Sequence, residues 1–191
     1  MTPTVTGLRE RKRGRIAVDL DERPWRVLPA DAVAHAGLAV GRPLDRNTAR
    51  ELARGMRRAR ALAAATRALA ASDRSQQALE HRLALAGHPA AAREDAIAVL
   101  DRAGLIDDGR VAESRAELLA RRGYGDAGIR ADLRQRLIPA EAAADALAGL
   151  EPELDRARRL LAGQSVTPAL LRRLAARGFS RDTLEEFAQE A

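Results

Sequence analysis

Three glycines near the middle of the chain have the spacing of a nucleotide-binding loop. Gly123, Gly125 and Gly128 spell G-x-G-x-x-G. In dinucleotide-binding proteins this loop follows a β-strand, so that the amides of the next helix meet a pyrophosphate. Here the preceding residues, RVAESRAELLARR, have the periodicity of an amphipathic helix. We therefore interpret the glycines as a flexible turn between helices, and we predict no cofactor.

Two other groups of residues could do chemistry but lack the necessary neighbours. Asp107 and Asp108 are adjacent carboxylates, yet no third and fourth oxygen ligands follow at a spacing that would close around calcium or magnesium. A helix N-cap is the favoured interpretation. His35, His81 and His88 are scattered, and the chain has no cysteine. The sequence thus predicts no metal site and no catalytic residue, and we expect a protein that is not an enzyme.

Arginine is the remaining candidate for binding chemistry. Guanidinium groups on a helix face bind phosphates or acidic protein surfaces. Tyr124, which stands between two glycines, could stack on a base or fill a pocket of a partner. Equally, the arginines could form solvated faces beside nearby Glu and Asp, and Tyr124 could cover the core. The candidate binding residues are Arg121, Arg122, Tyr124, Arg130, Arg134, Arg136, Arg172, Arg173 and Arg177.

The positive charge is concentrated in the first third of the chain. Residues 1–60 hold 14 basic and 7 acidic side chains, a net charge of +7, within a total of +6 for the whole chain. General attraction to DNA is therefore expected mostly from this part. The run from Arg9 to Arg13 reads as a flexible basic arm that is solvated or touches phosphates.

The elements that carry these residues are predicted to be mostly helical. Thr48 and Glu51 have the spacing of a capping box at the start of a helix that continues to about Ala71. Apolar residues at helical spacing predict further helices over 108–122 and from Gly125 to Leu137, and Pro139 fits the start of the next. By contrast, residues 15–20 and 25–28 alternate around the turn DERP, which predicts a β-hairpin.

A shared order of leucines, a turn, and a proline or serine recurs three times along the chain. A period of about 40 to 50 residues is typical of stacked helical units that bury thin cores only together. The predicted fold class is mostly α, with three tandem three-helix repeats and a small N-terminal lobe that contains the hairpin. The predicted domains are a basic arm and lobe at 1–47 and helical repeats at 48–106, 107–150 and 151–191.

Nothing in the sequence predicts export or membrane insertion. The N-terminus does not pair a basic start with an apolar run and a cleavage site. No uninterrupted apolar segment approaches the roughly 20 residues that cross a bilayer. We expect a soluble, cytoplasmic protein, and the repeats suggest a monomer.

Residues 103–138, AGLIDDGRVAESRAELLARRGYGDAGIRADLRQRLI, resemble the RecX family of bacterial recombination regulators. The resemblance extends over about 50–191, includes RGFS at 177–180, and takes in the hairpin with GLAVGRPLD, which is similar to the N-terminal lobes of some members. Val111 stands where the family usually has an aromatic residue. Leu137 stands where it usually has glycine, which puts in doubt a left-handed helix end there. The matching motif positions are Gly104, Leu105, Asp107, Asp108, Arg110, Ala112, Arg121, Arg122, Gly123, Gly125, Ile129, Leu133, Ile138 and Pro139.

The resemblance implies an elongated, curved helical array that lies in the groove of the RecA–DNA filament. There it would modulate, and most simply inhibit, filament assembly, ATPase, strand exchange and coprotease activity in DNA repair and the SOS response. The implied partners are the RecA filament and single-stranded DNA, with double-stranded DNA left open. The alternative is a helix-turn-helix-like DNA-binding transcriptional regulator, because three small helices with a cationic second or third helix also describe that class. A helical scaffold without nucleic acid is a third hypothesis.

Overall fold

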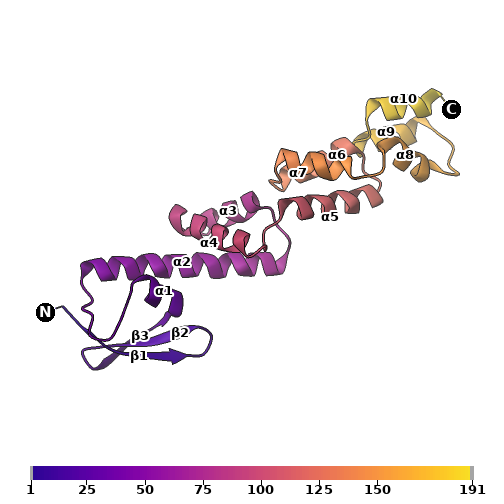
Figure 1. Cartoon of the computed structure of the whole chain (residues 1–191). Helices are drawn as coiled ribbons and strands as arrows, with labels where there is room; N and C mark the ends of the chain where they lie inside the picture. The colour runs from indigo at the N-terminus through magenta and orange to yellow at the C-terminus, as the bar shows by residue number, and fades with distance from the viewer. Residues whose placement is uncertain (1, 190–191) are drawn as a thin grey trace. The chain divides into compact units, whose positions relative to one another are not determined.

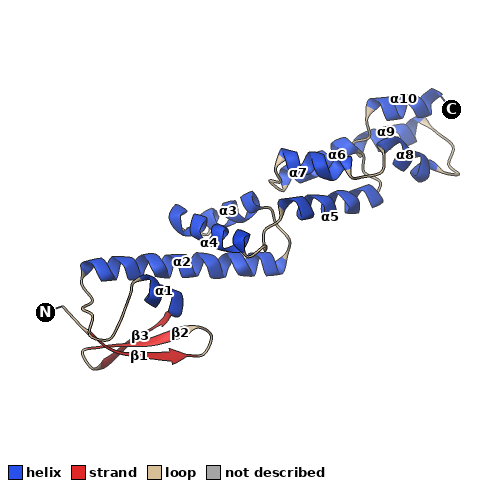
Figure 2. Ribbon diagram, viewed as in Figure 1, coloured by secondary structure: helices blue, strands red, loops and turns tan. Residues whose placement is uncertain are grey.

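The computed structural model describes residues 2–189, and it consists mostly of helices with one small sheet near the N-terminus (Figures 1 and 2). The chain forms two compact units. The first comprises the residues up to Ser72 together with Leu79–Leu105, and the second comprises Asp73–Ala78 and the residues from Ile106 onward. The predicted fold class is confirmed, while the domain boundaries proposed from the sequence stay a prediction. Over residues 2–189, no helix is both long enough and apolar enough to cross a membrane.

The sheet has three antiparallel strands in the order β1-β2-β3, namely β1 (Val5–Arg11), β2 (Arg15–Leu20) and β3 (Arg23–Pro29). The predicted hairpin corresponds to β2 and β3. The prediction of a flexible basic arm was wrong. Strand β1 pairs with β2 along its length and packs Val5 and Leu8 against the core. A strand needs apolar residues only at alternate positions, so the charged run concealed it.

Two helices cover this sheet and form the core of the lobe, α1 (Ala30–His35) and the long α2 (Arg46–Ala71). Gly55 of α2 faces α1 so closely that a Cβ there would lie 2.9 Å from Ala32 Cα. The predicted capping box was wrong. Asp45 is the N-cap, and its Oδ1 accepts a hydrogen bond from Thr48 N at 2.7 Å. This bond from the backbone of Thr48 lowers the pKa of Asp45 below its ordinary value.

The other helices of the first repeat are α3 (Gln76–Leu85) and α4 (Ala90–Arg102). Leu79 and Leu83 of α3 are buried, and Ser75 accepts a hydrogen bond from Ala78 N at the start of this helix. Helix α4 packs against α2 through alanines rather than large side chains. The buried residues of this contact are Ala61, Ala92 and Ala96.

In the second unit, α5 (Asp108–Arg121), α6 (Asp126–Gln135) and α7 (Ala140–Ala148) enclose the largest aliphatic core of that unit. Asp107 caps α5 by accepting a hydrogen bond from Arg110 N at 2.8 Å, so the N-cap prediction is confirmed. The last three helices are α8 (Glu153–Leu161), α9 (Pro168–Ala176) and α10 (Arg181–Gln189). Their core adds Phe179 and Phe187 to leucines and an alanine.

Leu137 ends α6 in the left-handed conformation, with φ at +57°. The expectation that Leu137, standing in place of glycine, would not form a left-handed helix end was therefore wrong. This conformation costs a non-glycine residue roughly 1–2 kcal/mol. Two features offset that cost. Ile138 is buried, and its amide donates to Leu133 O at 3.1 Å. Ser75 Oγ lies 2.9 Å from the carbonyl oxygens of both Arg136 and Leu137, to which its hydroxyl donates.

Candidate functional site

The turn between α5 and α6 is joined to the last repeat by backbone hydrogen bonds. Gly125 N donates to Arg177 O, and Ala127 N donates to Gly178 O, both at 3.0 Å. These residues are some 50 positions apart in the chain, and they belong to the same compact unit. The second and third repeats are thus connected main chain to main chain, an arrangement we call the repeat junction.

Glycine is required at three positions of the repeat junction. A Cβ on Gly125 would lie 2.3 Å from Phe179 N, and one on Gly128 would lie 2.3 Å from Arg177 O. On the facing segment, a Cβ on Gly178 would lie 2.1 Å from Gly128 N. The G-x-G-x-x-G spacing therefore serves close backbone packing. The predicted turn between helices is confirmed, but its glycines provide close packing rather than flexibility.

A buried arginine, which the sequence analysis did not single out, fills the space beside the junction. Arg156 of α8 is only 5% exposed. Its Nη1 donates to Tyr124 O at 3.0 Å, its Nε donates to Glu151 O at 2.9 Å, and its Nη2 pairs with the Asp126 carboxylate. Arginine can saturate three separate acceptors in this way because its donors lie in a rigid planar fork.

Glu153 connects the same two repeats through its carboxylate. Oε1 accepts a hydrogen bond from Asp126 N at 2.6 Å, while Oε2 accepts from Ser180 N and Thr183 Oγ1, both at 3.0 Å. Burial raises the pKa of this carboxyl, but the hydrogen bonds from Ser180, Asp126 and Thr183 outweigh burial and hold the pKa below its ordinary value. The ionised carboxylate is therefore the form that the fold stabilises.

Three of the predicted binding residues meet at the junction. Tyr124 is 37% exposed, and the guanidinium of Arg177 lies 6.0 Å from the centroid of its ring, within cation–π range. Arg177 Nη1 also donates to Arg122 O at 3.4 Å. The structure thus brings Tyr124, Arg177 and the backbone of Arg122 into one patch, although they come from two repeats.

The predicted arginines of α5 and α6 divide into paired and unpaired residues. Arg136 pairs with Asp132 at 2.8 Å, and Arg121 pairs with Glu117 at 3.4 Å. Among residues 2–189, no ion pair joins Arg130 or Arg134, and both are exposed. The two guanidinium groups of Arg130 and Arg134 on α6 are therefore available to a binding partner.

Asp132 is the anchor of that paired group. Arg115 of α5 donates to its two oxygens at 2.8 and 2.7 Å, a bidentate contact missed by the sequence analysis. The hydrogen bonds from Arg115, joined by that from Arg136, lower the pKa of Asp132 and exceed the opposing effect of burial. The same hydrogen bond raises the pKa of Arg115. The contact fixes α6 against α5 and orients the exposed side of α6.

Helix α9 carries the remaining candidates. Thr167 caps this helix by accepting a hydrogen bond from Leu170 N at 3.2 Å. Leu170 and Leu174 face the core, whereas Arg172 and Arg173 are exposed. Within the described part of the chain, neither arginine has an ion-pair partner. They form a second cationic surface in the last repeat.

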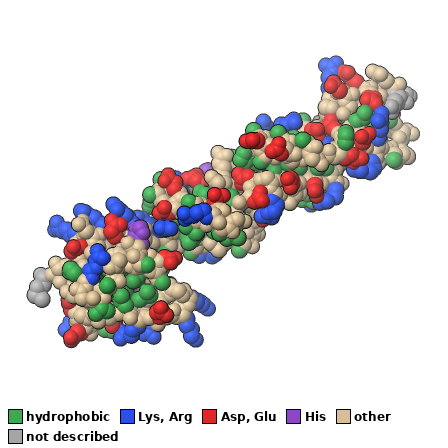
Figure 3. Space-filling model, in the orientation of Figure 1, with side chains coloured by type: hydrophobic (Ala, Val, Ile, Leu, Met, Phe, Trp, Pro, Cys, Tyr) green, Lys and Arg blue, Asp and Glu red, His purple; other side chains and the backbone are tan. Residues whose placement is uncertain are grey.

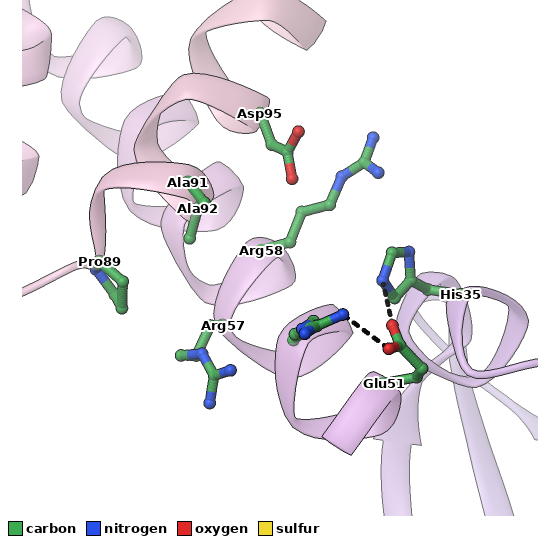
Figure 4. A pocket seen from close by; sticks show the side chains of 9 residues that line it. His35, Glu51, Arg57, Arg58, Pro89, Ala91, Ala92 and Asp95 are labelled. Carbon is green, nitrogen blue, oxygen red and sulfur yellow. Dashed lines mark hydrogen bonds and ion pairs between the residues drawn. The ribbon is translucent and has the colours of Figure 1, made fainter. Parts of the chain in front are cut away.

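A cleft of about 330 Å³ lies in the first unit, between α2 and the start of α4 (Figure 4). Glu51 lies in it, with Arg54 Nη1 at 2.7 Å and His35 Nε2 at 3.6 Å from its carboxylate oxygens. Arg57 and Arg58 also line the cleft. Over residues 2–189, no group of three or more His, Cys, Asp or Glu side chains is placed to hold a metal ion.

Comparison with known proteins identifies the central repeat. Residues 107–147 match the family model described as RecX, second three-helix domain. Regulatory protein RecX from two strains of Vibrio cholerae serotype O1 is 32% identical over 68 residues, which is 36% of this chain and 45% of each relative. The central repeat is thus similar in sequence to RecX proteins. The matched segment thus spans about half the length of these curated relatives.

Solved structures of RecX proteins share the fold. A crystal structure of regulatory protein RecX superposes with a TM-score of 0.82 at 22% identity, covering 98% of this chain and 99% of that chain. RecX from Lactobacillus salivarius gives a TM-score of 0.63 at 20% identity, covering 70% of this chain and 96% of that chain. The likeness extends from the helical repeats to the N-terminal lobe, because the first match covers nearly the whole chain.

Proposed function

We propose that this protein is a non-enzymatic regulator of the RecA recombinase, which binds in the groove of the RecA–DNA filament and inhibits its assembly. ATPase, strand exchange and coprotease activity would fall together, because all three depend on the assembled filament. The protein would act as a cytoplasmic monomer in DNA repair and the SOS response. The name of its relatives, regulatory protein RecX, supports a regulatory role.

The observation that carries this proposal is the exposed, unpaired arginine pair Arg130 and Arg134 on α6 within residues 2–189. Residues four apart lie on one face of a helix. The Arg115–Asp132 contact fixes that helix, so little backbone ordering remains to oppose binding. Carboxylates of RecA or phosphates of its DNA fit two adjacent guanidinium groups.

The last repeat would add a second contact. Arg172 and Arg173 on α9 are exposed, and the repeat junction holds their repeat firmly against the central one. Two rigidly linked contacts raise the effective local concentration of the second after the first has formed. The patch of Arg122, Tyr124 and Arg177 lies at the junction itself and would contact the same partner.

The test is the ATPase rate of RecA on single-stranded DNA, titrated with this protein below one molecule per RecA. We expect inhibition by the wild type and its loss in Arg130→Glu/Arg134→Glu. A control variant, Arg67→Glu/Arg102→Glu, makes the same charge change at two exposed arginines of the first unit and should still inhibit. Circular dichroism would verify that all variants keep their helix content.

Two outcomes would contradict the proposal. Equal inhibition by both double variants would remove the α6 face from the interaction. No inhibition by the folded wild-type protein would refute action on the filament. Sequence-specific binding to duplex DNA without RecA would then favour the transcriptional regulator.

A further inference from the structure

The three-stranded sheet has one face against the core of the lobe and one face directed away from it. Leu8, Ile16, Val18 and Leu28 pack against the core of the lobe. Side chains alternate along a strand, so the rows between them point to the opposite face. Cross-strand pairing defines two such rows, Arg9–Ala17–Val27 and Arg11–Arg15–Pro29. We call these rows the outer face.

The outer face places two arginines directly opposite each other. Arg11 pairs with Arg15 across β1 and β2, and both are exposed. Arg9 is neutralised by Asp19 at 2.9 Å, whereas no ion pair within residues 2–189 involves Arg11 or Arg15. Glu10 pairs with Ile16 and so belongs to the other face. Like charges directly opposite each other destabilise a sheet, and an anion bound between them would remove that repulsion.

The adjoining turn adds positive charge at the same end of the sheet. Lys12, Arg13 and Gly14 connect β1 to β2, and Arg13 is held in the left-handed conformation with φ at +63°. Arg15 Nη2 donates to Val27 O at 2.9 Å, which lays its guanidinium against β3. Figure 3 shows Lys and Arg side chains along the margin of this lobe.

Further along β3, towards the end of the sheet away from Arg11 and Arg15, an aromatic ring is exposed. Trp25 is the single tryptophan of a chain with only 2% aromatic residues, yet it is 36% exposed. Pairing of Val18 with Arg26 and of Asp19 with Pro24 leaves Trp25 without a cross-strand partner. Such bulges re-aim side chains. The Arg26 guanidinium lies 5.5 Å from the ring centroid, and Val27, 46% exposed, extends the apolar surface.

We propose that the sheet, through its outer face and Trp25, binds single-stranded DNA, with phosphates at Arg11 and Arg15 and an unstacked base on Trp25. Charge complementarity identifies the occupant, because paired guanidinium groups and an exposed aromatic ring are the two parts of a single-strand binding surface. A duplex would keep its bases stacked and leave the ring unused. The inference rests on the DNA partner of the proposed function, but it requires no RecA.

Trp25 makes the test direct, because its emission reports this surface alone. Oligothymidylate titrated into the full-length protein without RecA should quench the emission to saturation, and duplex DNA of equal length should quench it less. Neutralising two phosphate contacts should flatten the dependence of log affinity on log salt. For Arg11→Gln/Arg15→Gln we expect the slope to fall by about 1.4, at roughly 0.7 per phosphate on a single strand.

Anisotropy of a labelled oligothymidylate then tests the ring itself. Trp25→Ala should weaken binding about tenfold without changing the salt slope, since stacking is not ionic, and Trp25→Phe should retain most of the affinity. The control Arg67→Gln/Arg102→Gln removes the same charge elsewhere in the unit and should match the wild type.

Absence of saturable quenching, stronger binding of duplex than of single strand, or an unchanged salt slope in Arg11→Gln/Arg15→Gln would overturn the inference. So would unchanged affinity of Trp25→Ala. These outcomes are separable from failure of the proposed function. The RecA assay depends on Arg130 and Arg134, which lie in the other unit, and oligonucleotide binding to the sheet is measured without RecA.

Discussion

Arginine plays opposite parts in the repeat junction and on the outer face of the sheet. In the junction, Arg156 is 5% exposed and contacts Tyr124 O, Glu151 O and the Asp126 carboxylate. On the sheet, Arg11 is exposed and faces Arg15. One guanidinium holds two repeats together, and the other belongs to a residue that pairs across the strands with a like charge. Burial and partners, rather than the density of basic residues, therefore separate structural cations from those available to a ligand.

The largest effect is expected where the junction depends on backbone proximity. Gly178→Ala should lower the free energy of unfolding by about 3 kcal/mol, because left-handed strain adds to a clash with Gly128 N. Gly163→Ala is the matched control, since Gly163 has φ +77° against +82° but has open space around it. It should cost only about 1 kcal/mol. Urea denaturation followed by circular dichroism measures both, and equal losses would show that the junction is not tightly packed.

Removing the buried guanidinium should have the next largest effect. Arg156→Met leaves Tyr124 O and the partly exposed Asp126 carboxylate without their donor, and we expect the free energy of unfolding to fall by about 2 kcal/mol. Arg159→Met removes a surface arginine three residues further along α8, and it should stay within about 0.5 kcal/mol of the wild type. Urea midpoints for the two variants test this contrast, which similar midpoints would contradict.

Acid should weaken the junction through Glu153. Its pKa is lower in the folded protein than the unfolded value near 4.5. Its contribution is therefore complete above that value and is lost as the pH falls through the folded pKa. Between about pH 5 and pH 3, the melting temperature of the wild type should fall by a few degrees more than that of Glu153→Gln. An equal fall in melting temperature for the two proteins over this pH range would exclude Glu153 as a source of the pH dependence.

The smallest effect is expected on the sheet. Arg11→Gln removes one of two opposed like charges, so the free energy of unfolding of the first unit should be unchanged or higher by up to about 0.5 kcal/mol at low salt. Trp25 emission follows unfolding of this unit without a label. If Arg11→Gln instead lowered the free energy of unfolding by about as much as Arg156→Met, Arg11 would be an arginine that stabilises the fold.

Periodic patterns predicted the regular elements of this fold. The helix expected from Thr48 to Ala71 is α2 (Arg46–Ala71), and the helix expected over 108–122 is α5 (Asp108–Arg121). The cap shifted from Thr48 to Asp45 because either residue type can cap, and sequence does not show which one has the extended backbone. Strand β1 was missed because its second half, Arg9 to Arg11, is a continuous charged run that hides the alternation of apolar residues.

The candidate site was less predictable, because its key contacts join residues distant in sequence. Arg130 and Arg134 were identified as exposed cations, yet Arg136 proved to share Asp132 with Arg115. In sequence, nothing distinguishes the buried Arg156 from the exposed Arg159. The three glycines were noticed for their spacing, but their purpose depends on a backbone some 50 residues further along the chain.

The two backbone hydrogen bonds of the junction also make separation of the second and third repeats measurable by hydrogen exchange. The amides of Gly125 and Ala127 donate to carbonyl oxygens of another repeat, and the amide of Asp126 between them donates to the Glu153 carboxylate of that repeat. Their protons can exchange with solvent only when the second and third repeats separate. The exchange rates of those two amides would therefore time the opening of one repeat from the next, even while each repeat stays folded.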